Sequence, residues 1–116
     1  MLDPNLRACL RACVRCAHAC EQCADACQSE ANVVMLSDFI RANRDCAQLC
    51  WTASSLIIRG SDFVGELCEI CAKVCDRCAH ECEKYSYREC ALVCRDCADE
   101  CRKREAPSEP STGSRS

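Results

Sequence analysis

Apolar and small side chains recur along the chain at gaps of three and four residues, the spacing that puts side chains on one face of an α-helix. Four stretches follow this pattern, and cysteine occupies most of their inward a and d heptad positions. With Cys13 at position a, the charged residues Arg11, Glu21 and Asp25 fall at outward positions. The pattern therefore predicts amphipathic helices that bury thiols and expose charge.

The first two helices have recognisable ends. Asp3 followed by Pro4 predicts a helix start, because an N-cap carboxylate accepts backbone N–H groups and proline at the first helical position loses no hydrogen bond. This helix is expected to run to about residue 29 or 30. A second helix is expected after a short connection near residues 31–33, and to end at Gly60, which readily adopts the left-handed conformation of a helix C-terminus.

Two further helices complete the prediction. Ser61 and Asp62 predict the start of a third helix that runs to about residue 84. Ser86 and Glu89 form a capping-box sequence that predicts the start of a fourth, which ends near residue 104. Because the connections are short, consecutive helices should be antiparallel. The predicted fold class is all-α, an antiparallel up-down-up-down four-helix bundle with a cysteine-lined core.

The bundle is expected to be a single domain over residues 1–105, since 116 residues suffice for one core. Residues 106–116 contain two Pro, one Gly and five Ser or Thr, a composition that buries no apolar surface. We expect them to form a disordered C-terminal tail.

The composition excludes several classes of protein. With 15 Lys and Arg against 18 Asp and Glu, and few aromatic residues, the chain has neither the basic surface nor the stacking platform of a nucleic-acid-binding protein. The longest apolar run, Leu56-Ile57-Ile58, is too short to cross a membrane. The first residues lack the pattern of a secretory leader, so we expect a cytoplasmic protein. The 17 cysteines, an odd number, also fit free thiols better than a disulfide framework.

The cysteines are the candidate metal ligands. They are Cys9, Cys13, Cys16, Cys20, Cys23, Cys27, Cys46, Cys50, Cys68, Cys71, Cys75, Cys78, Cys82, Cys90, Cys94, Cys97 and Cys101. Cysteines three or four apart on a helix have β-carbons about 5 to 6 Å apart, so their sulfurs can approach to about 4 Å. That separation suits nearly linear coordination of Cu(I), a soft ion that prefers thiolates. Zn²⁺ instead requires four ligands in a closed tetrahedron at each site.

Charge favours Cu(I) over Zn²⁺ in a buried array. One Cu(I) per thiolate gives a neutral core, whereas each Zn²⁺ bound by four thiolates leaves two negative charges whose burial is costly. We therefore predict storage and detoxification of copper, with many Cu(I) ions per chain. A zinc or general thiol metal buffer and a metal-free interaction bundle are the alternatives. An enzyme is not expected, because a redox enzyme needs one exposed, low-pKa thiol and none stands out.

The cysteine pattern resembles that of the bacterial copper storage proteins over about residues 6–104. The motifs that carry the resemblance are Cys9-x3-Cys13-x2-Cys16-x3-Cys20, Arg41-x2-Arg44-Asp45-Cys46-Ala47-x2-Cys50, Glu69-x-Cys71-Ala72-x2-Cys75-x2-Cys78-x3-Cys82 and Cys94-x2-Cys97-Ala98-x2-Cys101. Members of that family are four-helix bundles with cysteine-packed cores that bind many Cu(I) ions. The resemblance to its cytosolic branch implies a homotetramer. We also expect a copper chaperone or a small thiol as the donor.

Four side chains outside the cysteine set need an interpretation. His18 and His80 lie in matching Cys-Ala-His contexts, yet both fall at heptad position f, which favours solvent exposure over metal binding. Met35, near the first connection, is interpreted as a gap-filling side chain or as a thioether that hands Cu(I) inward. Asn43 takes an inward position and is interpreted as a register-setting residue or a weak ligand.

One end of the bundle is the expected loading route. It gathers Cys27, Cys82 and Cys90 beside the two hairpin connections, and a soft ion that moves by ligand exchange needs thiols at its gate. The opposite end offers apolar side chains that are expected to form a plug: Leu6, Ile57, Phe63, Val64 and Leu67.

Overall fold

The structure, a computed structural model, describes residues 2–104 of the chain. Its elements are α1 (Pro4–Gln28), a 3₁₀ turn η1 (Val33–Leu36), α2 (Ser37–Arg59), α3 (Val64–Lys84) and α4 (Arg88–Arg104). The predicted tail, residues 106–116, lies outside the described residues.

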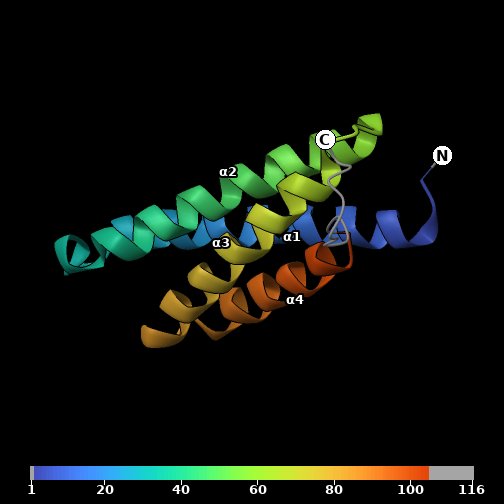
Figure 1. Cartoon of the computed structure of the whole chain (residues 1–116). Coiled ribbons are helices and arrows are strands. Elements are labelled where there is room, and N and C mark those ends of the chain that lie inside the picture. Colours follow the sequence, from blue (N-terminus) through green and yellow to red (C-terminus); the bar gives the residue numbers. More distant parts are fainter. Residues whose placement is uncertain (1, 105–116) are drawn as a thin grey trace.

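The four helices form a ring in which each contacts two neighbours. α1 packs against α2 and α4, and α3 also packs against α2 and α4. Figure 1 shows two hairpins, α1–α2 in blue to green and α3–α4 in yellow to red, that cross at an angle. The predicted up-down-up-down four-helix bundle is confirmed. Within the described part of the chain, no helix combines the length and the apolar character needed to span a membrane.

The start of α1 and the end of α2 agree with the sequence predictions. The Asp3 Oδ1 atom accepts a hydrogen bond from the backbone N–H of Leu6 at 2.8 Å, and Pro4 is the first helical residue. Gly60 has a φ of 67°, and the N–H of Ser61 donates to the carbonyl of Leu56 at 3.0 Å. Glycine fits this left-handed position because it has no β-carbon.

Helices α2 and α3 begin later than predicted. The preceding 3₁₀ turn η1 buries Leu36 under the core and delays the start of α2 to Ser37. Helix α3 begins at Val64, because the Ser61 Oγ atom accepts the N–H of Phe63 at 3.0 Å and closes a turn ahead of the helix instead of capping it.

The predicted capping box at Ser86 is wrong. Ser86 has a φ of 65°, and its N–H donates to the carbonyl of Glu83 at 3.2 Å. The N–H of Tyr87 donates to the carbonyl of Cys82 at 2.9 Å. These two bonds form a Schellman motif, so Ser86 ends α3 rather than starting α4, at a position where glycine is usual.

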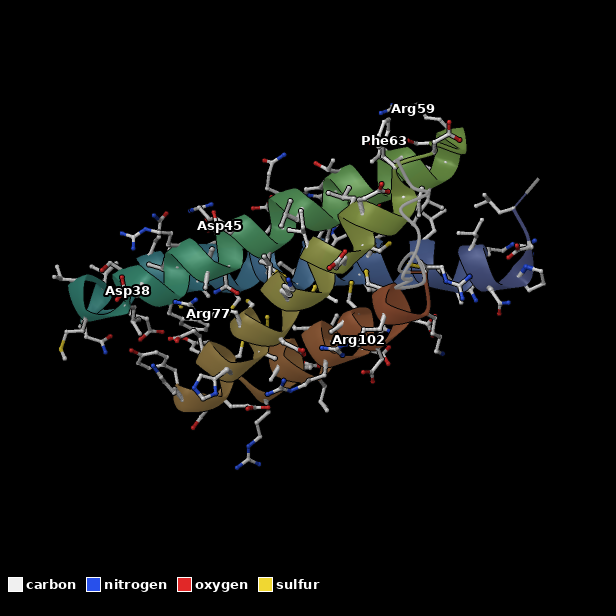
Figure 2. The ribbon with its side chains drawn as sticks, in the orientation of Figure 1. Asp38, Asp45, Arg59, Phe63, Arg77 and Arg102 are labelled. Atoms are coloured by element: carbon white, nitrogen blue, oxygen red, sulfur yellow. The ribbon has the colours of Figure 1, made fainter. Side chains whose placement is uncertain are left out.

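Larger apolar side chains close the ends of the thiol core. Phe39 is fully buried, and its ring lies 5.1 Å from that of Tyr85 and 5.2 Å from that of Tyr87. Ile57 is buried at the other end of α2, as predicted. Phe63, however, is 66% exposed at the α2–α3 turn, where Figure 2 labels it, and so does not belong to the predicted plug.

Candidate metal centre

All 17 cysteines lie in the core with free thiols. Each has no exposed surface except Cys23, at 6%, and Cys90, at 7%. Figure 2 shows the yellow sulfur atoms between the helices. The heptad pattern therefore placed every candidate ligand on the correct face.

Small neighbours let the sulfurs converge on the bundle axis. Ala17, Ala24, Ala79 and Ala98 flank cysteines and are themselves fully buried, so the helices can pack closely. The Cys16 Sγ atom lies 3.7 Å from the sulfurs of Cys46 and Cys94. It also lies 4.0 Å from that of Cys75, so this one thiol meets sulfurs from all three other helices.

The shortest sulfur contacts join different helices rather than successive turns of one helix. Of the thiol–thiol hydrogen bonds between 3.5 and 4.0 Å found in residues 2–104, that between Cys71 and Cys75, 3.9 Å long, lies within one helix, and the others join different helices. Sulfurs three or four residues apart on one helix also come close, within 4.8 Å for Cys16 and Cys20 and for Cys46 and Cys50. Inward side chains of four helices point at a common axis, which brings sulfurs together across the bundle.

Groups of three or four sulfurs, all within 4.8 Å of one another, follow each other along the core. Five of these groups are Cys9/Cys68/Cys101, Cys13/Cys71/Cys97/Cys101, Cys50/Cys71/Cys75/Cys97, Cys16/Cys46/Cys50/Cys75 and Cys16/Cys20/Cys46/Cys94. Each group shares one or two sulfurs with the next. The cysteines thus form a continuous thiol array rather than a set of separate sites.

Hydrogen bonds between thiols shift the pKa values of the array in both directions. Hydrogen bonds from Cys16, and then from Cys20 and Cys50, hold the pKa of Cys46 below its usual range. Interaction with Cys13 and other thiols, together with burial, raises the pKa of Cys50. A thiolate is stabilised where neighbours donate to it, and those neighbours then stay protonated. Metal loading must therefore displace protons from the array.

Cys23 and Tyr87, near the hairpin connections, keep their protons at neutral pH. A hydrogen bond from Cys82 lowers the pKa of Cys23, but contact with Cys90 and burial outweigh it and raise that pKa to about 12. A hydrogen bond to Cys27, together with burial, raises the pKa of Tyr87 to about 12.

Asn43 is a polar member of the array. Its side chain is fully buried, and its Oδ1 atom lies 3.2 Å from the Cys78 sulfur and 3.8 Å from the Cys90 sulfur. Its Nδ2 atom has no hydrogen-bond partner among the described residues. The sequence placed Asn43 inward, but only the three-dimensional packing shows that thiols surround it.

The histidines and Met35 lie outside the array. His18 is exposed, and its ring packs edge-on to that of Trp51 at 5.3 Å. His80 is exposed as well, so the predicted exposure of both histidines is confirmed. Met35 is 76% exposed, so its interpretation as a gap-filling core residue is wrong.

Known proteins share this fold and this sequence pattern. Residues 3–106 match the copper storage protein family. The cytosolic copper storage protein of Streptomyces lividans, in a structure with five coppers, is 33% identical with a TM-score of 0.84, covering 90% of this chain and 95% of that one. The Cu(I)-bound copper storage protein BsCsp3 of Bacillus subtilis is 36% identical with a TM-score of 0.82, and the match covers 88% of this chain and 99% of that one.

A further relative is the uncharacterized cysteine-rich protein YhjQ of Bacillus subtilis, 37% identical over 71 residues, or 61% of this chain. The match spans 66% of the length of that relative, just under two thirds. The family match covers residues 3–106, which include all 17 cysteines. The chain belongs to the copper storage protein family.

Proposed function

We propose that the protein stores copper by holding many Cu(I) ions in its thiol array, with all 17 cysteines as ligands, and thereby protects the cell from free copper. The observation that supports this most strongly is the overlap of successive sulfur groups. A sulfur that belongs to two groups is placed to bridge two ions, as thiolates do when each Cu(I) takes two of them. The relative from Streptomyces lividans holds five coppers in one structure and was loaded with ten equivalents in another.

Charge supports Cu(I) as the cargo of the buried array. With one Cu(I) per thiolate, the loaded core carries no net charge. A buried site with four thiolates and one Zn²⁺ keeps two negative charges, whose desolvation costs several kcal/mol per ion even after relaxation. Among residues 2–104, no cationic side chain lies in the fully buried core to offset such charge.

A zinc buffer is the second candidate, because single groups fit a tetrahedral ion. Zn–S bonds of about 2.3 Å place sulfurs about 3.8 Å apart, and the observed sulfur contacts are 3.5 to 4.0 Å. Groups that share sulfurs cannot all hold their own Zn²⁺, however. At four thiolates per ion, 17 cysteines accommodate about four zinc ions.

We further propose that the protein acts in the cytoplasm, is not an enzyme, and receives copper from a small thiol or a chaperone. A reducing compartment would keep the free thiols from forming disulfides. Full burial of nearly all thiols suits storage rather than a reactive cysteine, which needs access to its substrate.

A homotetramer is also proposed. Ile58, Ile70 and Leu92 are 65%, 50% and 69% exposed and offer apolar surface for contacts between subunits. Light scattering on the separated protein should give the mass of four chains, and a monomer mass would contradict the proposal.

Competition between the two metals tests the proposed cargo. The reduced protein is titrated anaerobically with Cu(I) in the presence of a chromophoric Cu(I) chelator, and in parallel with Zn²⁺. We expect the protein to withdraw many more Cu(I) ions from the chelator than the number of Zn²⁺ ions it binds. We also expect Cu(I) to displace bound zinc. Retention of Zn²⁺ against excess Cu(I) would instead favour the zinc buffer.

A further inference from the structure

Only one side of the bundle brings thiols to the surface. A groove of about 830 Å³ runs between α1 and α4, and its lining includes Cys23 and Cys90. These are the two cysteines that retain exposed surface. The volume falls within the range of small-molecule sites, about 300 to 1,000 Å³.

The groove on the opposite side, between α2 and α3, differs in its lining. It has a volume of about 510 Å³, and no cysteine is among the described residues that line it. Figure 2 labels three of its charged residues, Asp38 and Asp45 on α2 and Arg77 on α3. Met35 lies at this groove as well, so its thioether does not border the surface thiols.

The end of the bundle is a less direct route. The Phe39 ring, in the first turn of α2, packs against the rings of Tyr85 and Tyr87 in the α3–α4 connection. Cys27 and Cys82 have no exposed surface there. Of the three cysteines expected to form an end-on gate, only Cys90 reaches solvent, and it does so through the α1/α4 groove.

A series of short contacts connects Cys90 with the interior. The Cys90 and Cys78 sulfurs lie 3.8 and 3.2 Å from the Oδ1 atom of Asn43. The Cys78 sulfur lies 3.7 Å from that of Cys20, which lies 3.5 Å from that of Cys94. Cys20 and Cys94 belong to one of the four-sulfur groups. An ion bound at Cys90 can therefore move inward by successive ligand exchange.

The charged side chains of the groove favour an anionic ligand. Arg15 on α1 and Arg88 on α4 are exposed at the groove, opposed there by one carboxylate, Glu89. Two thiolates bound to one Cu(I) carry a net negative charge, to which the carboxylates of a small peptide thiol add. Arginine recognises such carboxylates through paired N–H donors.

We propose that the α1/α4 groove is where a small anionic Cu(I)–thiol complex docks and transfers its ion to Cys23 and Cys90. The proposal rests on the proposed storage of Cu(I). In the transfer, two Cu–S bonds to the carrier thiolates break and two Cu–S bonds to the protein form. Each proton that these protein thiols hold passes to a departing carrier thiolate, so charge is conserved and no oxidation takes place.

Stopped-flow loading from a Cu(I)–glutathione complex tests the role of the two thiols. The double variant Cys23→Ser/Cys90→Ser is compared with Cys27→Ser/Cys82→Ser, which also loses two thiols near the same end. Final capacity should fall by a similar amount in both. Initial uptake should be slowed about tenfold or more only in the groove variant. Equal initial rates in the two variants would overturn the proposal.

Charge reversal tests the docking step without removing a thiol. We expect Arg15→Glu/Arg88→Glu to slow uptake from Cu(I)–glutathione about 3- to 10-fold at low salt, with the effect shrinking as ionic strength rises. The control Arg41→Glu/Arg77→Glu makes the same change in net charge at the opposite groove and should load at the wild-type rate. An equal effect of both pairs would mean that overall charge, not this groove, governs uptake, and would overturn the proposal.

Final capacity separates failure of this proposal from failure of the proposed function. If the wild-type protein takes up only a few Cu(I) ions, storage itself is refuted. If capacity is high in every variant but no rate depends on the groove, storage stands and only the docking site is wrong.

Discussion

Replacing Asn43 with cysteine would exchange a buried amide for one more thiol in the middle of the array. The Nδ2 atom of Asn43 has no partner, and an unsatisfied buried donor costs about 1 to 3 kcal/mol. The substitution gives up the contact of Oδ1 with the Cys78 thiol, a weak donor whose bond contributes at most about 1 kcal/mol. Cysteine is similar in size and behaves as a small apolar residue in a core.

The net expectation for Asn43→Cys is a gain of about 1 kcal/mol in the free energy of unfolding of the metal-free protein. For a domain of about 100 residues this corresponds to a rise of about 4 to 8 °C in Tm. Thermal unfolding of the reduced protein, followed by far-UV circular dichroism, measures it. Gln48→Cys, which adds an exposed thiol on the same helix, is the control and should change stability by less than about 0.5 kcal/mol. A lower Tm or a broadened transition for Asn43→Cys would refute the reasoning and indicate that the amide sets the helix register.

Three further predictions concern the helix ends, the metal-free state and pH. Gly60→Ala should lower the free energy of unfolding by about 1 kcal/mol, because alanine is strained at a φ of 67°. Ser86→Gly should raise the free energy of unfolding by about 0.5 kcal/mol, because glycine has no β-carbon and is not strained at a φ of 65°. Urea unfolding measures both, and an unchanged midpoint for either would contradict the assigned backbone strain. Circular dichroism should show high helicity without metal, since neutral thiols fill the core as apolar residues; a chain disordered until loaded would contradict this. A hydrogen bond from Cys82 lowers the pKa of Cys23, but contact with Cys90 and burial outweigh it and raise this pKa from 9.0 to about 12. The stability contributed by this neutral thiol is therefore present below pH 9 and lost between about pH 9 and 12. Urea unfolding across that range should show a falling midpoint. A midpoint that rises there would contradict the prediction.

The heptad pattern was sufficient to predict the bundle and its core. Cysteine at a and d positions and charge at the others specify an inward face, and all 17 thiols are buried accordingly. Asp3 and Gly60 marked helix ends correctly, because their preferences depend on local backbone geometry alone. Ser86 misled because its residue type fits an N-cap, whereas the tight α3–α4 connection holds it in the left-handed region.

The features that required the structure are those set by how the helices cross. The pattern placed Cys23 and Cys90 inward like the other cysteines. The two hairpins cross at an angle, however, and a groove between α1 and α4 reaches Cys23 and Cys90, the two thiols that keep exposed surface. The surroundings of Asn43 also depend on relative helix positions, since Cys78 and Cys90 come from α3 and α4. No spacing along one helix encodes such contacts.

Direct counting of bound copper is the most decisive measurement for the neutral thiol array. The reduced protein is titrated anaerobically with Cu(I), separated from unbound metal, and analysed for copper and protein. If each thiolate bridges Cu(I) ions in a core without net charge, the count should approach one ion per cysteine, about 15 to 20 per chain. Saturation at about four or five ions, the number that separate four-thiolate sites would hold, would contradict it.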